Sequence, residues 1–303
     1  MRIKSTEAKC RLMEEGRDRA EWQDDIFADP NLVRRIMIEL KQAGDISEQE
    51  ADQLKEKYFK EYPLQIDNIK IISGILRIVA NQKELSTLKG ETRGKKLPDA
   101  EFRVLNKRIR RLAGLLSKYN NQVTSFVLDR REEKGILSNF WQLFEEAYQE
   151  EYSDSQAAKM ANSSRVGILS QVAVFEAFRE LDLEPRLAKE DEDARFNIDL
   201  WAKDGRAFQI KNYNKNEPLI FGRDKSVDAV REYYDAPLDM APKISDFIRH
   251  GMREMVNYGH KTQQDVKPFF ILAPNSMFDP VTGKPNEALV DFFRQRFPLD
   301  KQE

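Results

Sequence analysis

The sequence predicts an α/β fold for the C-terminal part of the chain, preceded by an all-helical N-terminal domain. Up to about residue 150, apolar residues recur at helical spacing and strand signals are nearly absent. Beyond it, short alternating apolar segments give the order helix, strand, strand, helix, strand, helix. Because the acidic, serine-bearing stretch 145–155 separates the two patterns, we expect a helical domain over residues 1–155 and an α/β domain over residues 156–303.

Local signals predict where the N-terminal helices begin and end. Asp29 followed by Pro30 indicates an N-cap and a first turn, and Gly44 stands where a C-terminal glycine belongs. Ser47 with Glu50 forms a capping box that predicts the start of another helix. Apolar residues at helical spacing predict further helices at residues 69–79, 102–116 and 121–149. Phe102 begins the apolar stripe of the second stretch, and the third is expected to form two helices.

The C-terminal part alternates between helical and strand patterns. Ser163 or Ser164 is positioned to cap a helix that runs to about Leu181. Strands are expected at residues 196–202, 207–212 and 269–273, with a long helix at about residues 244–256 before the last strand and a closing helix at residues 287–296.

Composition excludes several classes of protein. With 50 Lys+Arg against 52 Asp+Glu the net charge is −2, so the overall balance says nothing about a polyanionic partner. The single cysteine, Cys10, excludes a disulfide framework, and the two histidines, His250 and His260, argue against a histidine metal site. No secretory signal or membrane-length apolar run is present, so we expect a cytoplasmic protein without membrane contact.

One glycine-rich stretch superficially suggests a nucleotide site. The stretch from Gly90 to Lys96 has three residues between its glycines where a P-loop has four, and it ends in lysine instead of serine or threonine. We therefore expect no nucleotide cofactor.

The most informative segment is a predicted hairpin at residues 197–212. Asp204-Gly205 between two alternating runs fits a three-residue loop that starts at Lys203, a type I turn with the glycine left-handed. The resulting register pairs Ala202 with Arg206, Leu200 with Phe208, Asp199 with Gln209, and Ile198 with Ile210. The apolar members of these pairs then face the core together, while Asp199, Gln209 and Lys211 share the opposite face.

A carboxylate, an amide oxygen and an ammonium on one face suit a hard divalent cation such as Mg²⁺, with the lysine able to orient or deprotonate a water molecule. The alternative is that Asp199, Gln209 and Lys211 are the solvated half of an amphipathic strand. On the preceding helix, Glu176 lies in apolar surroundings, where a carboxylate is costly unless it is paired or bound to metal. Its alternative is a salt bridge to a basic group such as Arg179.

Together these residues resemble the PD-(D/E)XK nuclease superfamily. The chain is most similar to the branch with glutamine in the third acidic position, which includes type IV restriction nucleases and antiphage effector nucleases. The resemblance covers roughly residues 163–275 and is carried by Gly167, Phe175-Glu176, Asn197-Ile198-Asp199-Leu200 and Gln209-Ile210-Lys211-Asn212-Tyr213.

The resemblance implies a restriction-endonuclease-like α-β-β-β-α-β core and an endonuclease that hydrolyses DNA with Mg²⁺, for which Mn²⁺ can substitute. Asp199 would be the central metal ligand, Gln209 a ligand through its side-chain oxygen and Ile210 a ligand through its backbone carbonyl. Glu176 would be an outer ligand of the metal or its water, and Lys211 would orient the attacking water. A role in restriction or phage defence fits, and cutting both strands would favour a homodimer.

Two departures from the family pattern keep other functions open. Ile198 stands where the family has proline, and Gln209 replaces an acid, which removes one negative charge from the metal site. One alternative is therefore a catalytically inactive DNA-binding or structural protein with a nuclease-like fold. Another is a nuclease directed at RNA.

A basic segment is the best candidate for contact with the DNA backbone. Between Lys70 and Lys118 there are 13 Lys/Arg and 4 Asp/Glu, although the whole protein is nearly neutral. The alternative is a solvated helix face balanced by the acidic stretch 145–154. The residues expected to touch DNA are Arg103, Lys107, Arg110, Arg111, Lys215, Arg223 and Lys225.

Overall fold

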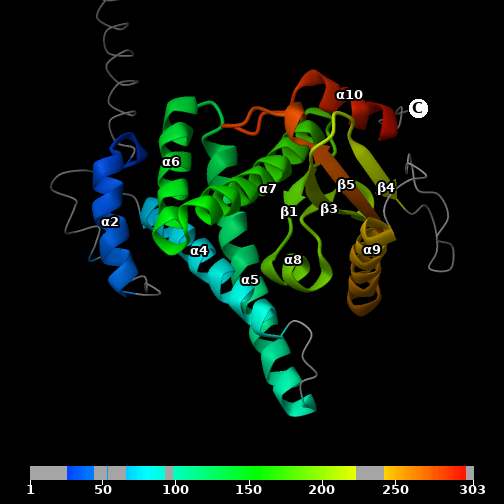
Figure 1. Cartoon of the computed structure of the whole chain (residues 1–303). Helices are drawn as coiled ribbons and strands as arrows, with labels where there is room; N and C mark the ends of the chain where they lie inside the picture. Colours follow the sequence, from blue (N-terminus) through cyan, green and yellow to red (C-terminus); the bar gives the residue numbers. More distant parts are fainter. Residues whose placement is uncertain (1–25, 44–52, 54–65, 93–97, 223–241, 298–303) are drawn as a thin grey trace, which may run out of the picture.

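The computed structural model describes residues 26–43, 53, 66–92, 98–222 and 242–297 of the chain. The N-terminal part is mostly helical, and the C-terminal part contains a five-stranded mixed sheet with helices on both faces (Figure 1). The predicted α/β class with a helical N-terminal part is therefore confirmed at this level. Among the helices described, none has the length and apolar character needed to cross a membrane.

The helical part begins as its sequence signals predict. Asp29 caps the first long helix, because its Oδ1 accepts hydrogen bonds from the backbone N–H groups of Asn31 (3.0 Å) and Leu32 (3.2 Å). Gly44, Ser47 and Glu50 lie outside the described residues. The elements of this part are η1 (Ile26–Ala28), α2 (Pro30–Ala43), α4 (Ile66–Thr92), α5 (Asp99–Asp129) and α6 (Lys134–Glu151).

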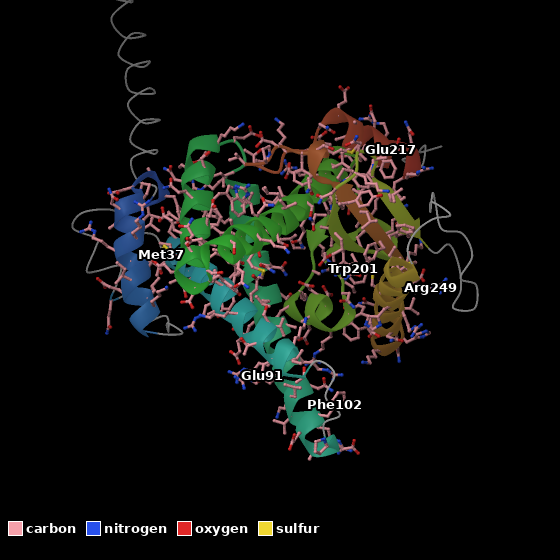
Figure 2. All side chains as sticks on the ribbon, viewed as in Figure 1. Met37, Glu91, Phe102, Trp201, Glu217 and Arg249 are labelled. Carbon is pink, nitrogen blue, oxygen red and sulfur yellow. The ribbon has the colours of Figure 1, made fainter. Side chains whose placement is uncertain are left out.

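Helices α4 and α5 form a hairpin arm that projects from the rest of the molecule (Figure 1). Phe102 lies on this arm, and its side chain is 53% exposed (Figure 2). The predicted apolar stripe is therefore wrong at its first position. Leu112 is buried, so the apolar face of α5 enters the core only in its later turns.

The expected cap at Ser163 or Ser164 is also wrong. Helix α7 spans Asp154–Glu180, so both serines lie in its interior. The Ser164 hydroxyl instead lies 2.8 Å from the Tyr148 hydroxyl and accepts a hydrogen bond from Gln82 Nε2 at 2.9 Å. These partners come from α6 and α4, so the serine serves tertiary packing rather than helix initiation.

The sheet has the strand order β1-β2-β3-β5-β4. Only the β3–β5 pair is parallel, and the other neighbours are antiparallel. The strands are β1 (Arg186–Leu187), β2 (Leu200–Ala202), β3 (Arg206–Tyr213), β4 (Leu219–Gly222) and β5 (Lys267–Pro274), and the helices of this part are α8 (Glu190–Phe196), α9 (Pro242–Thr262) and α10 (Glu287–Arg296). The helices expected at residues 244–256 and 287–296 are thus confirmed.

Two helical layers cover the sheet. On one face, Phe178 of α7 contacts Phe208 of β3 and Phe293 of α10, with ring centroids 4.8 and 4.9 Å apart. On the other face, Met255 of α9 is buried with Trp201 of β2. This packing buries β3 from Ala207 to Ile210, whereas the Lys211 side chain, further along the strand, remains 40% exposed.

The predicted hairpin register is confirmed within the strands. Residues 203–205 form the loop, Ala202 pairs with Arg206, and Leu200 pairs with Phe208. The turn itself differs, because Asp204 (φ 62°) is left-handed as well as Gly205 (φ 71°).

Ile198 does not follow the predicted alternation. It is buried with Trp201 and Met255 on the α9 face, whereas Leu200 belongs to the core on the α7 face. The reason is helix α8, which occupies the start of the expected strand and ends at a left-handed Asn197 (φ 55°), so that regular pairing begins only at Leu200.

One hydrophobic core joins the two parts of the chain. It runs from Ile26 to Phe297 and includes the whole buried face of α7. The connection between β5 and α10 also reaches across to α6 (Figure 1), where Trp141 Nε1 donates to the Val281 carbonyl (2.7 Å) and Lys134 pairs with Asp279 (3.0 Å). The predicted boundary between residues 155 and 156 falls in the first turn of α7.

Replacing Gly205 with alanine should lower the free energy of unfolding by about 1–3 kcal/mol, because the residue has a positive φ and a Cβ there would overlap the Asp265 carbonyl. The matched control is Gly135→Ala in α6, where nothing lies within 4 Å of the added Cβ. That control should change stability by less than about 1 kcal/mol. Chemical denaturation measures both, and equal effects would contradict the described loop.

Candidate active site

A pocket of about 280 Å³ opens where β2 and β3 separate beside α5, α7 and α8. Asp199, Ile210 and Lys211 line it, together with Asp193 of α8 and Gln171 of α7. Three of the residues expected at the active site are therefore brought together by the fold.

Asp199 is held by hydrogen bonds from three elements. Its backbone N–H donates to the Phe208 carbonyl (2.8 Å), and its carbonyl accepts from Gln171 Nε2 (3.0 Å) and from the Ala188 N–H (3.2 Å). Its Oδ2 accepts from the backbone N–H of Ile210 at 2.6 Å. The carboxylate is thus fixed at the start of β2, with the side chain 14% exposed.

Lys211 lies beside this carboxylate. Its Nζ is 3.7 Å from Asp199 Oδ2, and its side chain is 40% exposed. The ammonium can therefore pair with Asp199 and still contact a ligand that enters the pocket.

Asp193 is a site residue that the sequence analysis missed. Its Oδ2 accepts a hydrogen bond from Ser117 Oγ of α5 (2.5 Å), and its side chain lines the same pocket as Asp199. Burial and then the negative charge of Asp199 raise the pKa of Asp193 to about 7. Asp193 therefore holds a proton below about pH 7. No local motif marks Asp193, because its role depends on the packing of α8 against α5.

Gln209 does not join this group. Its side chain is only 3% exposed and is directed at α9, where a Cβ on Gly251 would overlap its Oε1. This oxygen has no hydrogen-bond partner among the described residues, and Gln209 does not line the pocket. The structure does not bring Gln209 together with Asp199 and Lys211, because α9 covers the part of β3 that carries this amide.

Glu176 is likewise placed elsewhere. Its side chain is 6% exposed, pairs with Arg179 and lies 3.5 Å from Arg131. Burial raises its pKa despite these two arginines. The structure shows the ion pair that was the alternative interpretation, and it does not bring Glu176 into the pocket with Asp199.

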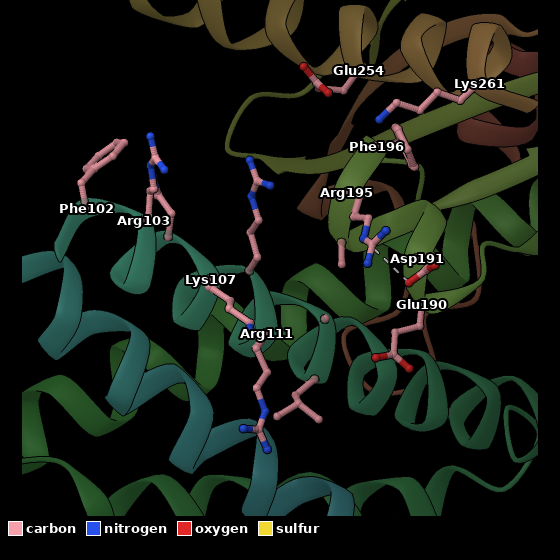
Figure 3. A pocket seen from close by; sticks show the side chains of 15 residues that line it. Phe102, Arg103, Lys107, Arg111, Glu190, Asp191, Arg195, Phe196, Glu254 and Lys261 are labelled. Carbon is pink, nitrogen blue, oxygen red and sulfur yellow. Dashed lines mark ion pairs between the residues drawn. The ribbon is translucent and has the colours of Figure 1, made fainter. Parts of the chain in front are cut away.

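The predicted basic face of α5 borders a second cavity, of about 870 Å³. Arg103, Lys107, Arg110 and Arg111 line it from α5, opposite residues of α8 and α9 (Figure 3). Lys215 is exposed on the β3–β4 connection and lines neither cavity. Arg223 and Lys225 lie outside the described residues.

Oxygen donors for a divalent cation are available in the smaller pocket. In the described part of the chain, no three His, Cys, Asp or Glu side chains are grouped as metal ligands. Asp193 and Asp199 nevertheless supply two adjacent carboxylates beside the backbone of Ile210. Carboxylate oxygens are the ligands that Mg²⁺ prefers, and a cation bound here would displace the proton that Asp193 holds below about pH 7.

Comparison with known proteins supplies no further assignment, since the chain matches no known protein family, no curated protein and no solved structure. The interpretation of the pocket therefore depends on its own chemistry.

The raised pKa of Asp193 predicts how stability changes with pH in metal-free protein. An unfolded aspartate titrates at about 3.9, whereas folded Asp193 titrates at about 7. Between these values the folded state binds more protons, so the free energy of unfolding should fall as pH rises from about 4 to about 7. The Asp193→Asn variant lacks this contribution. Its free energy of unfolding should therefore rise relative to that of the wild type as pH rises.

Denaturant unfolding in EDTA from about pH 5 to about pH 8 measures this difference. Asp191→Asn, an exposed position on the same helix, is the control and should track the wild type. A constant difference between Asp193→Asn and wild type across the interval would contradict the raised pKa of Asp193.

Proposed function

We propose that this protein is a Mg²⁺-dependent DNA endonuclease with a restriction-endonuclease-like core. The observation that carries the proposal is the meeting of Asp199, Lys211 and the Ile210 backbone in one pocket with a second carboxylate, Asp193. The element order supports it, because α7, β2, β3, β4, α9 and β5 follow the order that the family resemblance implies. Strand β1 and helix α8 are additional elements between α7 and β2.

Asp199, Asp193 and the Ile210 carbonyl would hold the cation. When bound, Mg²⁺ acidifies a water molecule and neutralises charge on the scissile phosphate. Asp193 would give up its proton for the site to load, and Asp199 would keep its orientation through the Ile210 N–H. Lys211 would then position the water or the phosphate, since its ammonium lies beside Asp199 and reaches solvent.

An inactive nucleic-acid-binding protein is the second candidate. It is favoured by the positions of Gln209, which packs against α9, and of Glu176, which forms ion pairs. The pocket is thereby left with two carboxylates as side-chain ligands for a metal. Cleavage of RNA is a further variant of the same chemistry. A cytoplasmic role in restriction or phage defence, with a homodimer cutting both strands, belongs to the active form of the proposal.

Asp199→Asn and Lys211→Ala should each lower Mg²⁺-dependent cleavage by about 10²-fold or more, because each removes a charge from the reacting centre. Asparagine retains an acceptor for the Ile210 N–H, so the fold should survive. Glu180→Gln, exposed on α7 and outside both cavities, is the matched control and should cleave normally. Supercoiled plasmid, circular single-stranded DNA and RNA should each be assayed with Mg²⁺, Mn²⁺ and EDTA.

Undiminished cleavage by a folded Asp199→Asn protein would refute the assigned centre. No cleavage of any substrate by the wild type would favour the inactive candidate.

The basic face of α5 should contribute to the salt dependence of DNA binding. Each phosphate contact contributes roughly 0.7 to 0.9 to the slope of log affinity against log salt, so Arg103→Gln, Lys107→Gln and Arg110→Gln together should reduce it by about 2 to 3. The control is Arg108→Gln on the same helix, because Arg108 is already paired with Glu84 at 2.6 Å. Binding measured in Ca²⁺ with uncleaved DNA should show a much smaller change for the control.

An unchanged slope in the triple variant would mean that this face is merely solvated.

A further inference from the structure

The 870 Å³ cavity is a cleft with two chemically different walls. The α5 wall carries four basic side chains and Phe102, whereas the opposite wall carries both charges and Phe196 (Figure 3). The lining has six basic and three acidic side chains, contributed by Arg103, Lys107, Arg110, Arg111, Arg195 and Lys261 and by Glu190, Asp191 and Glu254.

The basic residues of the α5 wall are exposed, and the structure shows no ion pair for them among the described residues. Arg108 differs, because it is turned toward α4 and pairs with Glu84 at 2.6 Å. The cationic row is therefore directed into the cleft and is not neutralised by the neighbouring helix. Such a row suits one phosphate backbone.

The opposite wall places an aromatic ring between charges of both signs. Phe196 packs edge-on against Tyr258, with ring centroids 5.1 Å apart, and Lys261 Nζ lies 4.9 Å from the centre of its ring. At the far end of the α5 wall, Phe102 offers a second ring, and this one is exposed, whereas Phe196 is half-buried. Aromatic rings beside a basic groove are the features by which proteins stack the bases of single strands.

We propose that this cleft binds single-stranded DNA, with the backbone along α5 and bases toward Phe102 and Phe196. A duplex is disfavoured because its second backbone would face a wall on which three carboxylates (Glu190, Asp191 and Glu254) outnumber two cations (Arg195 and Lys261). The proposal extends the nuclease function but is separable from it, since binding in the cleft requires no metal.

Helix α8 explains how such a strand relates to the candidate active site. Asp191 and Arg195 face the cleft, whereas Asp193, which is two residues from each, faces the pocket that contains Asp199. A strand in the cleft therefore lies along the other side of the helix that supplies the second carboxylate.

Fluorescence anisotropy in EDTA tests the proposal with a labelled mixed-sequence DNA, the same sequence as duplex and the same sequence as RNA. Single-stranded DNA should bind about ten-fold more tightly than the duplex, the effect expected from a stacked base. Phe102→Ala should lower affinity for the single strand about five-fold or more. Val104→Ala, 70% exposed on the same turn and outside the cleft, should not.

Lys261→Gln tests the second wall and should also weaken binding, while Arg108→Gln should leave it unchanged. Equal or tighter binding of the duplex, tighter binding of the RNA, or equal losses in Phe102→Ala and Val104→Ala would each overturn the proposal. Because no cleavage is measured, these outcomes do not depend on whether the protein is a nuclease.

Discussion

The hydrogen bonds of Asp199 are the constraint on which the arrangement of the C-terminal part depends. Its backbone joins β3 through Phe208, α7 through Gln171 and the connection between β1 and α8 through Ala188, while its side chain accepts a hydrogen bond from the Ile210 N–H. Buried backbone groups need such partners, so β2 can begin only where all of them meet. The same bonds orient the carboxylate toward Lys211. Asp199 therefore both holds these elements together and supplies a carboxylate of the candidate active site.

A second buried carboxylate, Glu192, fixes helix α8. It accepts hydrogen bonds from Arg186 (3.1 Å), the Lys189 N–H (2.7 Å), Trp201 Nε1 (3.0 Å) and the Tyr258 hydroxyl (2.8 Å). Burial acts to raise the pKa of Glu192, but these donors, Arg186 foremost, outweigh it and the pKa is lowered. An ionised Glu192 thus holds α8 against β1, β2 and α9, which directs the next residue, Asp193, toward Asp199.

Features encoded by neighbouring residues could be predicted from the sequence, and features created by distant packing could not. The hairpin register follows from alternation and loop length, and the Asp29 cap from local chemistry. In contrast, Asp193 acquires its role from Ser117, 76 residues away, and Gln209 is covered by Gly251 of α9. Alternation correctly put Gln209 and Lys211 on one face of β3, but it could not show that a helix covers only the first of them.

Helix α5 connects the pocket and the cleft within one rigid element. Its inner turns hold α8 through Ser117 and hold the connection that precedes α8 through Asn121, whose Nδ2 donates to the Ala188 carbonyl at 2.9 Å. Its outer turns carry the basic row, and no acidic residue occurs between Arg103 and Arg111. On a helix face that only contacts solvent, opposite charges four residues apart would stabilise the helix, whereas like charges four residues apart repel each other. The unbalanced row on an exposed arm therefore supports the proposed anionic ligand, which would relieve this repulsion when it binds.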